Sequence, residues 1–262
     1  MLDHIVFDAV SKTYPQADRK QLQALQNISF TVSQGEFVCL LGPSGCGKST
    51  LLKLLAGLEQ PDSGSASIDG YPIVRPRTGS AMVFQDYALF PWLNVEQNVA
   101  FGLELRHKRK EDVQATVRRF IQLVGLNGFE TSYPAQLSGG MKQRVAIARV
   151  LALSPNVLLM DEPFGALDSF TRMEMQSELV RLREHQPFTA LFVTHDIEEA
   201  VYLADRILVM TPRPGAIKRI VPVPLSRPRR RTQAEFTEIR NLVLEQYERA
   251  NVINSNALEP VF

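Results

Sequence analysis

Gly42-Pro43-Ser44-Gly45-Cys46-Gly47-Lys48-Ser49 is the stretch that decides the fold of this chain of 262 residues. It fits the phosphate-binding pattern G-x-x-x-x-G-K-[ST] at every fixed position. The apolar run 37–41 before it is typical of a buried strand. The leucines of residues 51–55 after it predict an apolar helix that ends at Gly57. Because this strand–loop–helix context is the one that the motif requires, we expect the chain to bind a nucleoside triphosphate.

The loop residues have distinct expected roles. The glycines let successive N–H groups converge on the β- and γ-phosphates at the positive end of the following helix. We expect Lys48 to be an exposed ligand group that neutralises phosphate charge, and the Ser49 hydroxyl to ligate Mg²⁺. The predicted nucleotide-binding residues here are Gly42, Pro43, Ser44, Gly45, Cys46, Gly47, Lys48, Ser49 and Thr50.

Composition narrows the class of protein. The chain is 45% hydrophobic and 22% charged, as in ordinary soluble globular proteins, and its formal net charge of +1 gives no basic field for nucleic acid. No apolar run approaches the ~18 residues that span a bilayer. A disulfide between Cys39 and Cys46 would stiffen a loop that must wrap a ligand, so we expect reduced thiols in a cytosolic protein.

Hydrophobic patterning predicts an α/β fold. Short apolar runs open the chain, a turn-rich stretch follows at 61–70, and helical periodicity appears at 113–124 and 145–151, closed by Gly125 and by Ser154-Pro155. Strands then alternate with helices, which implies a parallel sheet with a helical insertion at roughly 86–155. The runs expected as strands are 5–7, 28–32, 37–41, 81–84, 157–160, 190–193 and 207–210, and a final helix is expected to carry Phe236, Ile239, Leu242 and Val243.

Asp161 and Glu162 follow the apolar run 157–160, at the strand end that faces the ligand crevice of a parallel sheet. Phosphoryl transfer to water needs a carboxylate associated with Mg²⁺ and a group that orients the water. Asp161 suits the first role and Glu162 the second. His195 follows the run 190–193, so we expect it at the same sheet edge.

Ser138, Gly139 and Gly140 open the helix that carries the 145–151 pattern. Ser138 is a good N-cap, and the glycines leave backbone N–H groups accessible to an anion. Taken alone, the segment fits simple capping as well as anion binding.

Together these residues resemble the ATP-binding subunits of ABC transporters over about residues 3–225. In the family's pattern, 42–49 match Walker A, 157–162 match Walker B, 137–141 match the signature motif and 165–168 match the D-loop. The signature carries methionine at 141 where glutamine is more usual. Its Ser138, Gly139 and Gly140 remain, so the resemblance implies that signature function is kept.

The resemblance also implies roles for single residues. Glu162 matches the general base, Gln85 the Q-loop glutamine and His195 the switch histidine, and these three form the expected catalytic set. Ser49, Gln85 and Asp161 are the expected Mg²⁺ ligands. Tyr14 stands where an aromatic side chain stacks on adenine, the alternative being an ordinary half-buried tyrosine.

The family's architecture implies a P-loop NTPase core of ABC-ATPase type with an antiparallel β subdomain and a helical insertion subdomain. The whole chain, 1–262, would form one ABC ATPase domain. Segments 1–85 and 156–225 would form the RecA-like and β core, 86–155 the helical signature subdomain, and 226–262 a C-terminal helical tail.

The family's mechanism implies ATP and Mg²⁺ as cofactors and a head-to-tail pair of chains, identical or closely paralogous. Each ATP would lie between Walker A of one chain and the signature of the other. The channel would be formed by separate transmembrane permease subunits, served by an external solute-binding protein. This chain would lie peripherally at the cytoplasmic face of the inner membrane. Met141, 90–95 and 210–215 are similar to the nitrate/sulfonate/taurine/bicarbonate group of importers.

Other interpretations remain open. The apolar stretch 85–93 is either a groove for the permease's coupling helix, with Phe90 and Trp92 as anchors, or insertion-core packing. We expect 227–231, which holds four arginines, to be a solvated linker, with contact to anionic lipid as the alternative. Rival functions are a non-transport ABC ATPase in DNA repair or translation and a non-hydrolysing regulatory subunit. The single module without a heptad tract disfavours the non-transport ABC ATPase. The presence of Glu162 and His195 disfavours the non-hydrolysing subunit.

Overall fold

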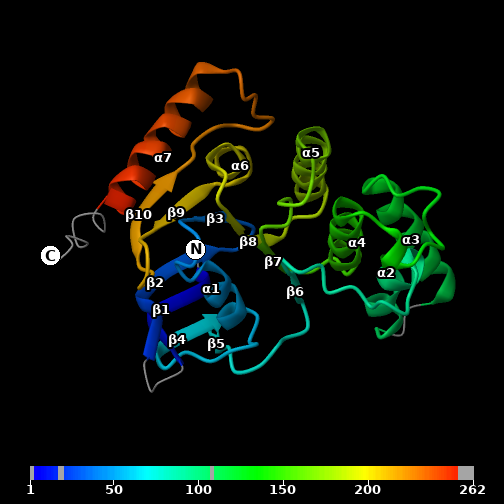
Figure 1. Cartoon of the computed structure of the whole chain (residues 1–262), viewed down its shortest axis with the longest axis horizontal. Helices are drawn as coiled ribbons and strands as arrows, with labels where there is room; N and C mark the ends of the chain where they lie inside the picture. The colour runs from blue at the N-terminus through cyan, green and yellow to red at the C-terminus, as the bar shows by residue number, and fades with distance from the viewer. Residues whose placement is uncertain (1–2, 17–20, 107–108, 253–262) are drawn as a thin grey trace, which may run out of the picture. The chain divides into compact units, whose positions relative to one another are not determined.

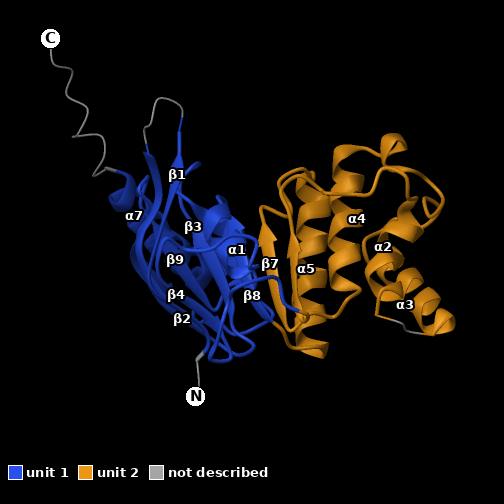
Figure 2. Cartoon of the chain, turned by 90° about the horizontal axis from the view of Figure 1, so that it is seen from below, with its two compact units in different colours: residues 1–77, 189–262 blue, residues 78–188 orange. Residues whose placement is uncertain are grey.

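The computed structural model describes residues 3–16, 21–106 and 109–252, and the chain divides into two compact units. Unit 1 is built from residues up to Arg77 and from Thr189 onward, and unit 2 from Thr78–Phe188 (Figure 2). None of the helices in the described part of the chain is long and apolar enough to cross a lipid bilayer. The last ten residues of the predicted tail, 253–262, lie outside the described residues.

Unit 1 contains an antiparallel sheet with the strand order β2-β1-β4-β5. Its strands are β1 (Asp3–Pro15), β2 (Gln21–Ser33), β4 (Ser63–Ile68) and β5 (Tyr71–Pro72) (Figure 1). β4 lies inside the stretch predicted as turns. It forms because β1 supplies backbone partners and because Ala66 and Ile68 are buried, which local turn propensity does not register.

Unit 1 also contains the parallel strands that carry the phosphate loop. β3 (Phe37–Leu41) pairs in parallel with β8 (Thr189–Thr194) and with β9 (Arg206–Met210), and β10 (Ile217–Pro222) pairs antiparallel with β9. Helix α1 (Lys48–Leu55) follows β3, and α6 (Ile197–Leu203) joins β8 to β9. β3 and β8 are buried along their whole length, as continuous apolar runs predict.

Unit 2 contains a parallel strand pair and packed helices. β6 (Ser80–Val83) pairs with β7 (Val157–Asp161). α2 (Val95–Glu104), α3 (Lys110–Leu123) and α4 (Gly139–Leu151) contact one another, and α5 (Ser169–His185) follows β7. The predicted apolar face of α3 is buried throughout, and the helix ends just before Gly125, which has φ +63°. The α/β class is therefore confirmed.

The C-terminal helix α7 (Ala234–Val252) contacts α6 and β9 within unit 1. The helix forms as predicted; Phe236 and Val243 are buried, whereas Leu242 is 42% exposed. Residues seven apart share a helix face, whereas Leu242 stands about 100° away from Val243. The buried face of α7 therefore carries Phe236 and Val243 but not Leu242.

The arginines of 227–231 do not form a solvated linker, so that prediction was wrong. Arg229 is 7% exposed and donates hydrogen bonds to the carbonyls of Val201 (2.7 Å) and Ala204 (2.6 Å) at the end of α6. Arg227 donates to the Leu203 carbonyl at 2.6 Å. The last carbonyls of a helix lack partners within it and carry negative partial charge, so a guanidinium satisfies them well.

We expect Arg229→Ala to lower the free energy of unfolding by about 3 kcal/mol, because several buried carbonyls lose their donor at once. Thermal unfolding followed by circular dichroism measures this change. Arg230→Ala is the matched control, since Arg230 is exposed. Equal melting temperatures for the two variants would contradict the role given to Arg229.

Candidate functional site

The phosphate loop joins β3 to α1 in unit 1. Gly45 and Gly47 have φ of +74° and +100°, a left-handed region that glycine enters without strain. α1 has no side-chain cap and no acidic residue in its first turn. Because its first N–H groups lack partners within the helix, this end of α1 suits an anion.

Lys48 is buried, with 6% of its surface exposed, so the prediction that this side chain is exposed was wrong. Its Nζ donates to the carbonyls of Gly42 (2.7 Å) and Pro43 (2.9 Å). The ammonium is therefore held by the loop's own backbone, and the aliphatic stem is covered by its surroundings. The loop and its lysine form one hydrogen-bonded unit.

Both cysteines are free and buried, as expected for reduced thiols. Burial raises the pKa of the Cys46 thiol, and burial raises that of Cys39 well above its usual value. Both side chains are therefore neutral at physiological pH. Cys46 contributes packing to the phosphate loop rather than charge.

Tyr14 lies close to the start of α1. Its hydroxyl donates to the Glu59 carboxylate and lies 3.5 Å from Thr50 Oγ1. Burial, together with the hydrogen bond to Glu59, raises the pKa of Tyr14 to about 12, so the phenol stays neutral. The ring is half-buried and has the ammonium of Lys12 at 5.6 Å from its centroid.

His195 follows β8 at the sheet edge that carries the phosphate loop. The register pairs Thr194 with Leu41, so His195 and Gly42 each come one residue beyond a paired position. His195 is exposed. Asp196 next to it accepts a hydrogen bond from the Glu199 N–H and begins α6. This capping fixes the backbone directly after His195.

Unit 2 brings Gln85, Asp161 and Glu162 to one sheet edge. The register pairs Val83 with Met160, so Gln85 and Glu162 both stand two residues beyond that pair. Asp161 is 5% exposed, whereas Glu162 is half-buried and Gln85 is exposed. Glu162 has φ +46°, a rare backbone conformation for a residue with a side chain.

The signature segment begins α4 in unit 2. Ser138 Oγ accepts from the Met141 N–H at 3.2 Å, which confirms Ser138 as the N-cap. A Cβ built on Gly139 would stand 3.2 Å from Tyr87 Oη, and one on Gly140 would stand 3.3 Å from the Ala166 carbonyl oxygen. The glycines therefore permit close approach of neighbouring segments, and Ser138 and Gly139 stay exposed.

Comparison with known proteins identifies the family. The family model described as ABC transporter matches residues 25–165. The aliphatic sulfonates import ATP-binding protein SsuB of Bacillus cereus is 48% identical over 252 residues, which cover 96% of this chain and 99% of that protein. This chain belongs to the ABC transporter family. It is thus an ATPase of the type coupled to transport, as the resemblance implied.

Two further likenesses support the assignment to the ABC transporter family. The bicarbonate transport ATP-binding protein CmpC of Synechococcus elongatus is 45% identical over 267 residues, covering 98% of this chain and 40% of that protein. The ATP-binding cassette MJ0796, solved as a dimer in a post-hydrolysis state with ADP and Pi, gives a TM-score of 0.78 at 32% identity. That match covers 85% of this chain and 100% of the other. The ABC-type ATPase fold is confirmed.

Two residues that the sequence analysis did not single out shape the segment after Gln85 in this ABC cassette. Arg149 of α4 donates to the Ala88 carbonyl at 2.8 Å and lies over the Phe90 ring, 5.4 Å from its centroid. Asn98 of α2 is fully buried and donates to the Leu93 carbonyl at 2.8 Å. Arg149 stands among apolar residues of its helix, which was an available signal. Asn98 directly follows Glu96 and Gln97, so nothing in the local sequence marked it as buried.

The same segment presents an aromatic patch. Trp92 is 69% exposed, so core packing does not describe it. Phe90 is half-buried and packs on Phe101 and Trp92, with ring centroids 4.4 Å and 5.6 Å away. The two aromatic residues differ, since Phe90 supports the surface and Trp92 projects from it.

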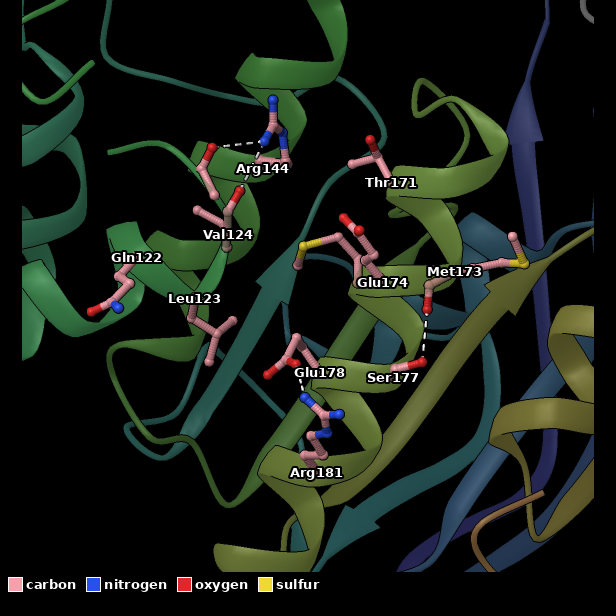
Figure 3. Close-up of a pocket in the computed structure, with 12 residues that line it drawn as sticks. Gln122, Leu123, Val124, Arg144, Thr171, Met173, Glu174, Ser177, Glu178 and Arg181 are labelled. Atoms are coloured by element: carbon pink, nitrogen blue, oxygen red, sulfur yellow. Dashed lines mark hydrogen bonds and ion pairs between the residues drawn. The ribbon is translucent and has the colours of Figure 1, made fainter. Parts of the chain in front are cut away.

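Unit 2 also contains a cavity of about 690 Å³ between the end of α3, α4 and α5. Figure 3 shows Arg144 there, donating at 3.0 Å to the Val124 carbonyl, and Glu178 paired with Arg181. None of the residues predicted to bind nucleotide lines this cavity. It is therefore separate from the predicted ATP-binding residues.

Proposed function

We propose that this chain is the ATP-hydrolysing subunit of an importer of small oxyanions, with aliphatic sulfonates as the first candidate. The observation that carries this proposal is the identity of 48% over nearly the whole length of a sulfonate importer subunit. Bicarbonate is the second candidate, supported by the identity of 45% to a bicarbonate transport subunit. Nitrate and taurine belong to the same chemical group of small oxyanions.

Unit 1 would bind the phosphates of ATP. The glycines of the loop and the uncapped start of α1 supply N–H groups, and Lys48 supplies positive charge beside them. The neutral ring of Tyr14 would stack on adenine, close to Thr50. For its Nζ to reach a phosphate, Lys48 would exchange at least one of its two carbonyl acceptors for a phosphate oxygen.

The residues expected to hold Mg²⁺ fit that ion chemically. Ser49 offers a hydroxyl, Gln85 an amide oxygen and Asp161 a carboxylate, and Mg²⁺ prefers oxygen ligands, usually with few from the protein. Asp161 is buried at the end of β7, which restricts its orientation. When bound, the ion would neutralise phosphate charge.

Hydrolysis would depend on Glu162, Gln85 and His195. Glu162 would accept a proton from the attacking water, and Gln85 would help to position that water. His195 would donate a hydrogen bond to the γ-phosphate. The common sheet edge of Gln85 and Glu162 supports their joint action.

Two chains would act together, with the signature of one facing the ATP held by the other. Ser138 and Gly139 are exposed, and α4 begins with accessible N–H groups beyond the one that Ser138 caps. Both MJ0796 cassette structures are dimers. A homodimer, or a pair with a close paralogue, would fit these features.

This chain would lie at the cytoplasmic face of the membrane, where its partners would be transmembrane permease subunits, with an external solute-binding protein acting through them. The exposed Trp92 packs on Phe90 and precedes Leu93, whose carbonyl Asn98 holds, so it suits a hydrophobic anchor at such an interface. Nucleic acid is not among the proposed partners, since the net charge is +1.

Trp92→Ala is expected to weaken the permease contact while the isolated chain still hydrolyses ATP. Removing an aromatic anchor that becomes buried in an interface typically costs about 2 kcal/mol or more of binding free energy. Co-purification of tagged chain with its permease measures the loss, and Phe129→Ala, at a side chain 43% exposed in the same unit, is the control. Retention of wild-type permease by Trp92→Ala would contradict the anchor role.

The solute is tested by deleting the gene for this chain in its own cells. Growth on ethanesulfonate as the only sulfur source should stop, whereas growth on sulfate should continue. Returning the intact gene should restore growth on ethanesulfonate. Loss of growth only at low bicarbonate would replace the sulfonate proposal by the bicarbonate one. Normal growth in all these media would remove both candidates.

A further inference from the structure

The loop between β9 and β10 reaches the phosphate loop within unit 1. This hairpin loop, residues 211–216, follows Met210 at the end of β9 and lies beside the start of α1 and β2. Arg213 donates to the Gly45 carbonyl from Nε at 3.0 Å and from Nη2 at 2.9 Å. Two N–H groups of one guanidinium therefore hold a single carbonyl in the middle of the phosphate loop.

The hairpin loop is itself fixed in position. The Gly215 N–H donates to the Ala24 carbonyl at 2.9 Å, and the Gln26 N–H donates to the Gly215 carbonyl at 2.9 Å. A Cβ built on Gly215 would stand 1.9 Å from the Cys46 carbonyl oxygen. The hairpin backbone thus lies against Cys46 while Arg213 holds Gly45, so two successive residues of the phosphate loop are braced.

The bond to Gly45 matters because of the geometry of the peptide unit. In a planar trans peptide the carbonyl of Gly45 and the N–H of Cys46 point in opposite directions. Gly45 has φ +74°, and a glycine leaves the adjoining peptide planes easy to rotate. The Cys46 N–H itself donates to the Pro43 carbonyl at a long distance of 3.4 Å. Fixing the Gly45 carbonyl therefore fixes a peptide plane in the middle of the loop before a ligand arrives, which lowers the ordering cost of binding.

We propose that Arg213 is a positioning residue that pre-orders the phosphate loop for ATP. The proposal rests on the proposed function of residues 42–49 and adds a residue outside them. Arg213 is exposed, so the contact should contribute little to overall stability and mainly to nucleotide affinity. Its guanidinium also adds positive charge beside a loop that receives a triphosphate.

The test compares Arg213→Ala with Arg213→Lys and with Arg219→Ala, an exposed arginine on β10 of the same hairpin. Arg213→Ala should raise the Kd and KM for Mg-ATP by about three- to tenfold, with kcat within about twofold of wild type. Arg213→Lys should recover part of the affinity, because one ammonium cannot reproduce the two-pronged contact. Arg219→Ala should match wild type.

A purely structural role predicts a different result: a lower melting temperature and less active protein, with an unchanged KM. That result, or a KM for Arg213→Ala equal to that of Arg219→Ala, overturns the positioning role. Lys48→Ala, measured alongside, separates this failure from that of the proposed function. If Lys48→Ala keeps wild-type ATP affinity, the nucleotide site and the role of Arg213 are both overturned.

Discussion

Glu162→Gln is expected to lower ATP turnover by about 10²–10⁴-fold while ATP still binds, because glutamine keeps the size of the side chain but cannot accept the proton of water. Glu162 begins the turn after β7 with φ +46°, and glutamine, which has the same shape, should adopt the same backbone conformation. Steady-state phosphate release measures turnover, and equilibrium binding of a fluorescent nucleotide measures affinity.

The same variant should accumulate as an ATP-dependent dimer. If ATP bridges the phosphate loop of one chain and Ser138 of the other, blocking hydrolysis leaves the pair closed. Light scattering should then show a doubling of mass on addition of ATP. Asp161→Asn is the contrasting variant, since it should lose Mg²⁺-dependent binding and show much less dimer.

Two outcomes would count against these assignments separately. Normal turnover by Glu162→Gln would remove the general-base role. Tight ATP binding by a protein that stays monomeric would instead remove the shared-site dimer and leave the base in place.

Lys48→Ala is expected to abolish hydrolysis and to weaken ATP binding by at least about 100-fold, since the variant loses the cation beside the phosphates. The buried setting of Lys48 adds a second effect. Its loss removes the Nζ donor from the carbonyls of Gly42 and Pro43, although Pro43 keeps the Cys46 N–H at 3.4 Å, so we expect the free energy of unfolding to fall by about 1–3 kcal/mol. The fold should nevertheless persist at 20 °C.

Lys53→Ala is the matched control for Lys48→Ala. Lys53 lies on the same helix, is not buried and lies 3.8 Å from a Glu59 carboxylate oxygen. Its removal should change neither ATP affinity nor turnover measurably. A folded Lys48→Ala protein with near wild-type turnover would overturn the phosphate-loop assignment.

The ABC transporter family could be predicted from short motifs because ABC chemistry constrains residues that lie close together in sequence. Comparison with whole proteins was needed to confirm the family, since the matched family model covers 25–165 and leaves Tyr14 and His195 outside it. The roles of single site residues remain proposals that the variants above test.

Local sequence determined the strand–loop–helix at 37–55, the capping by Ser138 and the buried faces of α3 and α4. In each case the decisive partners lie within a few residues, so spacing and propensity suffice to predict them. Because the ends of parallel strands meet at one sheet edge, the sequence also predicted that site residues following such strands share an edge. The structure added the register of β6 with β7 and of β3 with β8.

Tertiary structure alone decided the surroundings of Lys48, Arg213 and Arg229. Each cation makes its bonds with backbone carbonyls, which every residue type carries, so nothing in the sequence marks the acceptors. For Arg213 and Arg229 the acceptors are also distant in the chain, at Gly45 and in α6. Whether a charged side chain is solvated or buried depends on which carbonyls the fold leaves without partners nearby, and only the folded chain specifies that.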